Sequence, residues 1–268
     1  MRKVLHFMVM VILVVMGTSL VTLAEVPVLP DQVVYDSEGL TITLKNLEMD
    51  SGRGEIKALI ENGTSDKLIV QVRNFCINGF VVDTSISEEV APGKKANGII
   101  KFMTKDFESL FGIKEINAIQ FQFIVYVNSF SESYYTDIID VALEGNEDYV
   151  QEYDNSGVIV YEDDVIEIVS KGLDESGTAI MLYSHNKTDD FIILQARDTS
   201  IDGFMVDPTM SFEIPAGAYI IDRMKFSPSD LEDNDLESID NVESGFIIYA
   251  KGFSVIEKIE EPLEIAVE

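Results

Sequence analysis

Histidine and cysteine are the first candidates for catalysis, and the chain has few of them. It contains His6, His185 and Cys76. A Ser-His-Asp triad would need His185, since His6 lies in the extreme N-terminal segment, and no Gly-x-Ser-x-Gly turn accompanies it. A nucleophilic Cys76 would need a nearby base and a lowered pKa. We interpret His185 as an exposed residue at a strand end and Cys76 as a small half-buried filler, and we expect no enzymatic activity.

Acidic side chains are the remaining candidates for chemistry. Asp230, Glu232, Asp233 and Asp235 crowd one stretch that continues to Asp240. Carboxylate oxygens can bind Ca²⁺, but the stretch lacks an Asp-x-Asp-x-Asp-Gly loop, so a solvated acidic loop is favoured and Ca²⁺ is only a weak candidate. A zinc site would need three or four His or Cys ligands, which the chain cannot supply. We expect no other cofactor.

Carboxylate pairs alone can also hydrolyse glycosidic bonds, so a carboxylate-based hydrolase is one alternative function. Three acidic positions recur between the two parts of the chain, as Asp83/Asp207, Glu89/Glu213 and Asp106/Asp230. Strand, turn and helix-cap roles account for all three. The hydrolase is therefore the less favoured hypothesis.

Charge and composition exclude several classes of partner. The chain has 268 residues, with 19 Lys and Arg against 48 Asp and Glu, a net charge of −29. This charge repels nucleic acid phosphates and anionic membrane surfaces. A single cysteine excludes a disulfide within one molecule.

The N-terminus has the layout of an export signal. Arg2 and Lys3 precede the apolar run 4–15, and Thr22-Leu23-Ala24 offers small residues for cleavage before Glu25. We expect a signal peptide over residues 1–24 and a mature protein that is extracellular or at the cell surface. The alternative is an uncleaved anchor, since residues 4–24 are long enough to span a bilayer.

An internal repeat is the strongest pattern in the sequence. Residues 62–93 align without a gap to residues 186–217, and 14 of the 32 pairs are identical. Residues 145–157, between the two copies, are acidic and end in Asp-Asn-Ser-Gly, which is typical of a linker. We expect one repeat over residues 25–144 and a second over residues 158–268.

Alternating apolar residues predict strands, and each repeat has a strong hairpin signal. Asn78-Gly79 and Asp202-Gly203 suit a type I′ turn, in which both central residues have positive φ. The apolar parity changes before each turn, so we predict a β-bulge near Arg73-Asn74 and near Arg197-Asp198. Ser227-Pro228-Ser229-Asp230 predicts the start of a short helix, with a less clearly capped equivalent near Met103 and Asp106.

Arg73 and Asp83 recur as Arg197 and Asp207 on the arms of the two hairpins. The favoured interpretation is a structural Arg–carboxylate pair across each hairpin, and the alternative is a ligand-binding arginine.

Two other groups have competing interpretations. Asn62-Gly63-Thr64 and Asn186-Lys187-Thr188 fit the glycosylation pattern, but their equivalent places favour a turn. Aromatic residues gather around the end of the first repeat, and they suit a contact surface as well as internal packing. These residues are Phe130, Tyr134, Tyr135, Tyr149, Tyr153 and Tyr161.

The repeated string resembles a known family. Gln-x-Arg, Ile-Asn/Asp-Gly-Phe-x-Val-Asp, Pro/Ala-Gly and Phe-x-x-x-Asp are similar to an uncharacterised immunoglobulin-like repeat of secreted proteins and lipoproteins from Gram-positive gut bacteria. The resemblance implies a fold and a surface location, and no activity. This chain lacks the anchoring cysteine of the lipoprotein members.

Together these features predict an all-β fold, with two tandem immunoglobulin-like β-sandwiches that each carry one short helix. The expected function is a non-enzymatic binding or adhesion module at the cell surface, with an unknown protein or glycan ligand. A structural spacer at the cell envelope is a further alternative. The sequence leaves the oligomeric state open.

Overall fold

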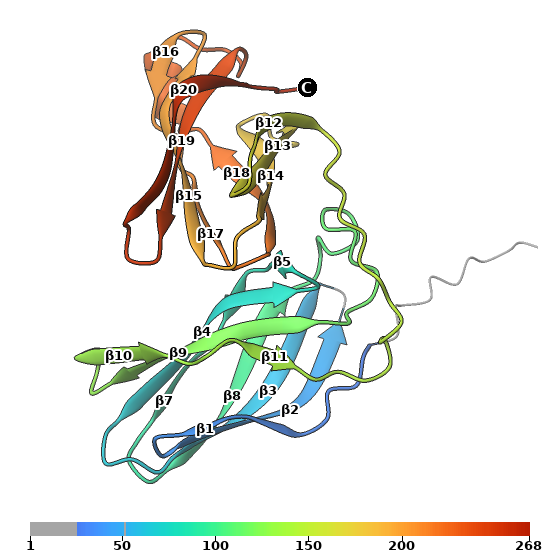
Figure 1. Cartoon of the computed structure of the whole chain (residues 1–268), viewed down its shortest axis with the longest axis vertical. Helices are drawn as coiled ribbons and strands as arrows, with labels where there is room; N and C mark the ends of the chain where they lie inside the picture. The colour runs from blue at the N-terminus through green and yellow to red at the C-terminus, as the bar shows by residue number, and fades with distance from the viewer. Residues whose placement is uncertain (1–25, 51) are drawn as a thin grey trace, which may run out of the picture.

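The computed structural model describes residues 26–50 and 52–268, and these are built almost entirely of β-strands (Figure 1). The predicted signal peptide lies outside the described residues. None of the described helices has the length and apolar character needed to cross a membrane. We call residues 26–144 the first half and residues 158–268 the second half.

The first half contains two sheets. Its strands are β1 (Gln32–Ser37), β2 (Leu40–Asp50), β3 (Arg53–Asn62), β4 (Leu68–Ile77), β5 (Phe80–Val81), β6 (Thr84–Ser85), β7 (Ser87–Val90), β8 (Lys95–Met103), β9 (Ile119–Val127), β10 (Glu132–Tyr135) and β11 (Ile139–Val141). One sheet has the order β1-β2-β3-β8-β6, and the other begins β10-β9-β4-β5, with β7 beside β4 and β11 beside β9.

A hydrophobic core lies between these two sheets. Leu40, Ile42 and Leu44 of β2 are fully buried and alternate with partly exposed residues, as expected for a strand with one wet face. They belong to the same cluster as Phe121 and Phe123 of β9. The arrangement is sandwich-like.

The second half is also formed by two sheets. Its elements are β12 (Val158–Glu162), β13 (Ile166–Leu173), β14 (Ala179–Asn186), β15 (Ile192–Ile201), β16 (Phe204–Val206), β17 (Ser211–Ile214), β18 (Tyr219–Lys225), α1 (Pro228–Asp233), β19 (Val242–Ala250) and β20 (Val255–Ile265). Strands β18-β14-β13-β12 lie in one sheet, and β16-β15-β19-β20, with β17 beside β15, form the other. A second hydrophobic cluster packs between them.

Both predicted hairpins and both predicted bulges are confirmed. Asn78 and Gly79 have φ of 48° and 81°, and Asp202 and Gly203 have φ of 51° and 83°. Ile77 pairs with Phe80, and Ile201 pairs with Phe204, across these turns. The ladder between β4 and β9 shifts register between Arg73 and Cys76, and the ladder between β15 and β19 shifts between Arg197 and Ser200. In each case one extra residue in the strand returns the apolar side chains that follow it to the core side of the sheet.

The helix prediction is half wrong. In the second half α1 begins at Pro228, as expected, although the Ser227 hydroxyl contacts the Ser229 hydroxyl at 2.6 Å and makes no cap hydrogen bond. In the described part of the first half, no helix forms. The segment after β8 makes only single turns, such as Leu110 N to Asp106 O at 2.9 Å. Met103 stands where a cap would be needed and is the last residue of β8, so nothing starts a helix there.

The two halves meet at the β4–β5 hairpin. Phe80 of β5 and Tyr219 of β18 are partners in a single parallel bridge, so sheets of both halves join into one of ten strands. The Tyr219 ring stacks on Tyr153 at 4.0 Å and on His185 at 4.1 Å. Figure 1 shows β5 directly beneath the second half.

Some side chains at the junction pack with the hydrophobic cluster of the other half. Cys76 of β4 belongs to the hydrophobic cluster of the second half. Conversely, Met181, Tyr183 and Ile221 of the second half belong to the cluster of the first. Each half thus has a hydrophobic cluster of its own, and the two clusters share side chains at the junction.

The predicted linker is packed rather than loose. The Gln151 Oε1 atom accepts a hydrogen bond from Asn78 Nδ2 at 3.1 Å, and the Asn117 Nδ2 atom donates to Tyr149 O. Tyr153 OH donates to Asn78 O at 3.0 Å. The linker thus lies across the turn of the first hairpin.

Candidate functional site

One set of side chains occupies the same place on the outside of both halves. Neighbouring strands put Ile69, Gln71 and Arg73 beside Tyr126, Ile124 and Gln122, and the second half repeats this pattern. We call this surface the outer Gln–Arg face. In the first half it comprises Ile69, Gln71, Arg73, Ser87, Ile124, Tyr126 and Phe130. In the second half it comprises Ile193, Gln195, Arg197, Ser211, Ile247, Tyr249 and Phe253.

A hydrogen-bonded chain runs across each outer Gln–Arg face. In the first half Gln71 Nε2 donates to Ser87 Oγ at 3.1 Å, and Arg73 Nη2 donates to Gln71 Oε1 at 2.7 Å. The second half has the same two bonds. There Gln195 Nε2 donates to Ser211 Oγ at 3.1 Å, and Arg197 Nη2 donates to Gln195 Oε1 at 2.6 Å. Each arginine is thus held by its neighbours and keeps further N–H groups for a ligand.

A phenylalanine at a hairpin tip extends each face. Phe130 and Phe253 are 60% and 64% exposed, and their rings lie 4.6 and 5.9 Å from those of Tyr126 and Tyr249. Both have positive φ, 73° and 64°, a conformation that is strained for a bulky side chain. Exposed apolar area and backbone strain at equivalent tips are typical of a contact surface.

The predicted Arg–Asp pairs are not formed. Among the described residues, no ion pair includes Arg73 or Arg197, and Arg73 instead donates to Gln71 and to Val72 O. Arg197 and Asp207 line one pocket, but no ion pair joins them. Each guanidinium borders a pocket, of about 510 Å³ at Arg73 and about 450 Å³ at Arg197. Lys101 lines the first pocket, and Asp207 and Asp230 line the second.

His185 lies at a strand end as predicted but is half-buried and not exposed, and Cys76 is more deeply buried than predicted. His185 pairs with Tyr219 and Glu167 across the sheet, and burial lowers its pKa. Cys76 is buried, and burial raises the pKa of its thiol to about 12. A thiol with so high a pKa is a poor nucleophile at neutral pH.

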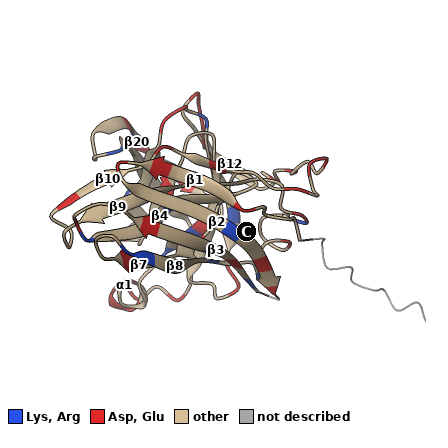
Figure 2. Cartoon of the chain, turned by 90° about the horizontal axis from the view of Figure 1, so that it is seen from below, with Lys and Arg blue, Asp and Glu red and all other residues tan. Residues whose placement is uncertain are grey.

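The acidic stretch from Asp230 to Asp240 forms α1 and the loop after it. Asp230 Oδ2 accepts a hydrogen bond from the Asp207 amide at 3.4 Å. Within residues 26–50 and 52–268, no three His, Cys, Asp or Glu side chains are grouped so that they could hold a metal ion. Acidic residues are spread over many strands and loops (Figure 2).

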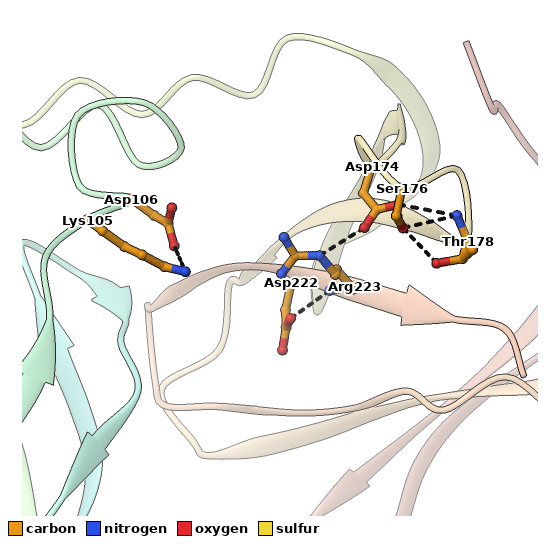
Figure 3. Close-up of polar contacts among 7 residues, drawn as sticks. All are labelled: Lys105, Asp106, Asp174, Ser176, Thr178, Asp222 and Arg223. Carbon is orange, nitrogen blue, oxygen red and sulfur yellow. Dashed lines mark hydrogen bonds and ion pairs between the residues drawn. The ribbon is translucent and has the colours of Figure 1, made fainter. Parts of the chain in front are cut away.

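Other polar groups form hydrogen bonds that stabilise the fold. Figure 3 shows Asp174 accepting hydrogen bonds from Ser176, Thr178 and Arg223, which ties the β13–β14 turn to β18. The pair Lys105 and Asp106 lies on the first-half loop in the same view, and no bond joins it to this group.

Asn62 and Asn186 are buried turn residues. Asn62 Nδ2 donates to Asp66 O and Val90 O, and Asn186 Nδ2 donates to Asp190 O and Ile214 O. Their Oδ1 atoms accept from Thr64 and Thr188. The turn interpretation is confirmed, and the amide groups are not available for a glycan.

The aromatic cluster of the first half divides into two groups. Tyr149 and Tyr153 pack at the junction, whereas Phe130 and Tyr135 remain exposed. Lys251 Nζ of the second half lies 3.5 Å from the centre of the Tyr135 ring, a cation–π contact between the halves. Sequence reasoning missed Phe253. The spacing Tyr-x-x-x-Phe, present at Tyr126 and again at Tyr249, could have revealed it.

Comparison with known proteins gives little guidance. No family model matches the chain, and no curated protein sequence is similar to it. A crystal structure of the YadV chaperone is 12% identical, with a TM-score of 0.27 over 79% of this chain and 92% of that one. Red sea bream transglutaminase is 7% identical, with a TM-score of 0.22 over 80% of this chain and 29% of that one. Neither likeness is close enough to define a family or an activity.

Proposed function

We propose that this protein is a non-enzymatic binding module, secreted or displayed at the cell surface. Its two halves would be immunoglobulin-like copies of one unit, over residues 25–144 and 158–268, joined by residues 145–157. Equivalent turns, equivalent bulges and equivalent strand registers support this duplication. The export signal expected over residues 1–24 supports the location.

The observation that carries the proposal is the repetition of the outer Gln–Arg face. Inward-facing residues recur in a duplicated unit because each core must be filled, but outward-facing residues are under no such constraint. Here an arginine, a glutamine, a tyrosine and an exposed phenylalanine recur together. Arginine and aromatic side chains dominate binding energy in protein interfaces. The ligand would offer oxygen acceptors to Arg73 and Arg197 and apolar surface to Phe130 and Phe253.

Two equivalent faces on one chain favour a ligand with repeated epitopes. Simultaneous binding at both faces raises the apparent affinity well above that of either one. A polymeric glycan or an oligomeric surface protein would provide such repeats.

The test is binding of the purified protein to arrays of glycans and of surface proteins, with and without Ca²⁺. A hit is then measured against Arg73→Ala/Phe130→Ala, against Arg197→Ala/Phe253→Ala, and against all four changes together. We expect each pair to weaken binding and the fourfold variant to abolish it. Phe204→Ala is the matched control, since Phe204 is 49% exposed but lies off the face. No binding on any array would favour a structural spacer instead.

A further inference from the structure

The lateral edge of the second half contains a groove beside the turn Asp202-Gly203, whereas the pocket at the equivalent turn Asn78-Gly79 is smaller, about 450 Å³, and is lined in part by the linker residues Tyr149, Gln151 and Tyr153. The lining of the second-half groove comprises Val158, Ile159, Asp202, Gly203, Asn241, Val242, Glu243, Glu264, Ile265, Ala266 and Val267, and it measures about 800 Å³. We call it the lateral groove. It shares no residue with the outer Gln–Arg face.

The register of the edge strands identifies the equivalent place in the first half. In β1, Gln32 and Val33 pair with Leu44 and Thr43, and the ladder then shifts before Tyr35. In β12, Val158 and Ile159 pair with Ser170 and Val169, and the ladder shifts before Tyr161. Val33 and Ile159 are therefore equivalent, and so are Gln32 and Val158.

The first half covers part of this edge with its own chain, although β1 pairs with β2 alone. Val28 and Glu144 form a bridge with N–O distances of 2.8 and 2.9 Å, and the neighbouring Leu29 is buried in the core. The Gln32 side chain bonds both the amide and the carbonyl of Ala142, at 3.0 and 2.9 Å. The linker residues Gln151 and Tyr153 cover the adjoining turn at Asn78.

The second half has neither the bridge nor the amide contact among its described residues. Val158 replaces Gln32, so no side-chain amide reaches Ala266, the equivalent of Ala142, and the Ala266 carbonyl accepts a hydrogen bond from Ser170 Oγ instead. Asp154, which precedes Val158 as Val28 precedes Gln32, ion-pairs with Lys171 at 3.8 Å instead. Val158 and Ile159 are 49% and 57% exposed, and β12 pairs with β13 alone, as β1 pairs with β2 alone.

We propose that the lateral groove binds an extended peptide segment of a partner protein, apolar at its centre and flanked by lysine or arginine. The apolar centre follows from the exposed Val158 and Ile159 and from the Val28-Leu29 segment that covers part of the equivalent edge. The basic flanks follow from charge: Asp202, Glu243 and Glu264 line the groove, and no Lys or Arg does. The free edge of β12 can accept the backbone of such a segment as an added strand.

The probe is a fluorescent peptide with the sequence of residues 26–30, Val-Pro-Val-Leu-Pro, carrying two lysines at each end. A second peptide carries two glutamates at each end. Binding to the purified protein is followed by fluorescence anisotropy. We expect the lysine-flanked peptide to bind at least about tenfold more tightly, with an affinity that falls as salt is added.

Ile159→Glu is the test variant and Val33→Glu is its matched control, because both side chains are exposed at equivalent positions. Ile159→Glu should weaken binding of the lysine-flanked peptide by about tenfold or more, and Val33→Glu should leave it unchanged. The lysine-flanked peptide should also bind normally to Arg197→Ala/Phe253→Ala. The proposal for the lateral groove and the proposal for the outer Gln–Arg faces can therefore be tested independently.

Three results would overturn the proposal. The first is no saturable binding of either peptide, and the second is equal binding by Ile159→Glu and the unaltered protein. The third is self-association of the protein, seen by sedimentation and abolished by Ile159→Glu, which would assign the groove to a second copy of this chain.

Discussion

Phe80 and Tyr219 are neighbours in a parallel bridge between the two halves, and their rings lie 5.7 Å apart. Phe80 sits at the tip of the first hairpin and is 1% exposed, whereas its equivalent Phe204 is 49% exposed. The same residue at the same turn is thus an interior side chain in one half and a surface side chain in the other. Contact with Tyr153, Tyr219 and Phe111 makes the difference.

Removing the Phe80 ring should loosen the junction. Phe80→Ala leaves a cavity between the halves, so we expect the free energy of unfolding to fall by about 3–5 kcal/mol. Phe204→Ala, at the equivalent exposed place, should change it by no more than about 0.5 kcal/mol. Urea denaturation of both variants measures the difference. Equal losses would show that the junction is not packed as described.

Replacing Asn78 by aspartate, the residue at the equivalent position 202 of the second half, should lower the stability of the protein. Its Oδ1 accepts from the amides of Asn117 and Ala118, and its Nδ2 donates to Glu115 O and Gln151 Oε1. Asn78→Asp removes the donor and leaves two buried acceptors without it, at a cost of about 1–3 kcal/mol. The reciprocal Asp202→Asn is the control, since Asp202 Oδ1 only accepts from Asn241. Chemical denaturation that finds the two changes equally harmful would contradict this role.

Protonation of His185 should destabilise the protein. Burial lowers the pKa of His185 below its ordinary value, Lys187 acts in the same direction, and Glu167 opposes them. The unfolded chain therefore takes up this proton at a higher pH than the folded one. The stability contributed by neutral His185 is complete above the unfolded pKa of about 6.5, and it is lost as the pH falls below that value.

The measurement compares the unaltered protein with His185→Gln in urea at pH of about 7.5 and about 5. The unaltered protein should lose more stability on acidification than the variant does. An equal loss in both proteins would assign the effect to the many carboxyl groups instead.

Cys76 should be unreactive while the protein is folded. Its side chain is 3% exposed, and burial raises the thiol pKa to about 12. A thiol reagent such as dithionitrobenzoate should label it only in denaturant, and no disulfide-linked dimer should form on oxidation. Rapid labelling of the native protein would show that β4 opens at the junction.

The phenylalanines at the hairpin tips should contribute little to stability. Phe253 has a φ of 64°, which glycine adopts without strain, so Phe253→Gly relieves strain while it loses the contact with Tyr249. The two effects offset each other, and we expect a change within about 1 kcal/mol. Phe246→Ala, at a buried position of β19, should cost about 3–5 kcal/mol. A comparable loss from both changes would mean that Phe253 has a structural role.

Local features of the fold could be predicted because they depend on residues close in sequence. Positive φ at Asn78-Gly79 and the extra residue after Arg73 follow from turn chemistry and apolar parity. The missing helix near Asp106 was harder to foresee, because its turns are held by the loop's burial of Phe107 and not by caps. The predicted Arg73–Asp83 pair does not form, and Arg73 instead donates hydrogen bonds to Gln71 and Val72 of its own strand.

The junction was not predicted, although the sequence contains a signal for it. Strand pairing makes Met181 and Tyr183 equivalent to Lys57 and Leu59. It likewise makes Tyr219 and Ile221 equivalent to Lys95 and Asn97. Three of these four outward positions change from polar to apolar between the halves. An outer face that is apolar in one copy only predicts that this face packs against another surface. Local sequence patterns do not identify that surface, because the contact joins residues far apart in the chain.

The packing between the two halves has a practical consequence for experiments on fragments of this chain. Cutting at residue 157 would take Cys76 away from its neighbours in one fragment and leave Tyr183, Met181 and Ile221 uncovered in the other. Each fragment would then expose apolar side chains to solvent and would tend to aggregate. Mapping of the ligand should therefore use the intact chain and replace the binding residues of one outer Gln–Arg face at a time by point substitution.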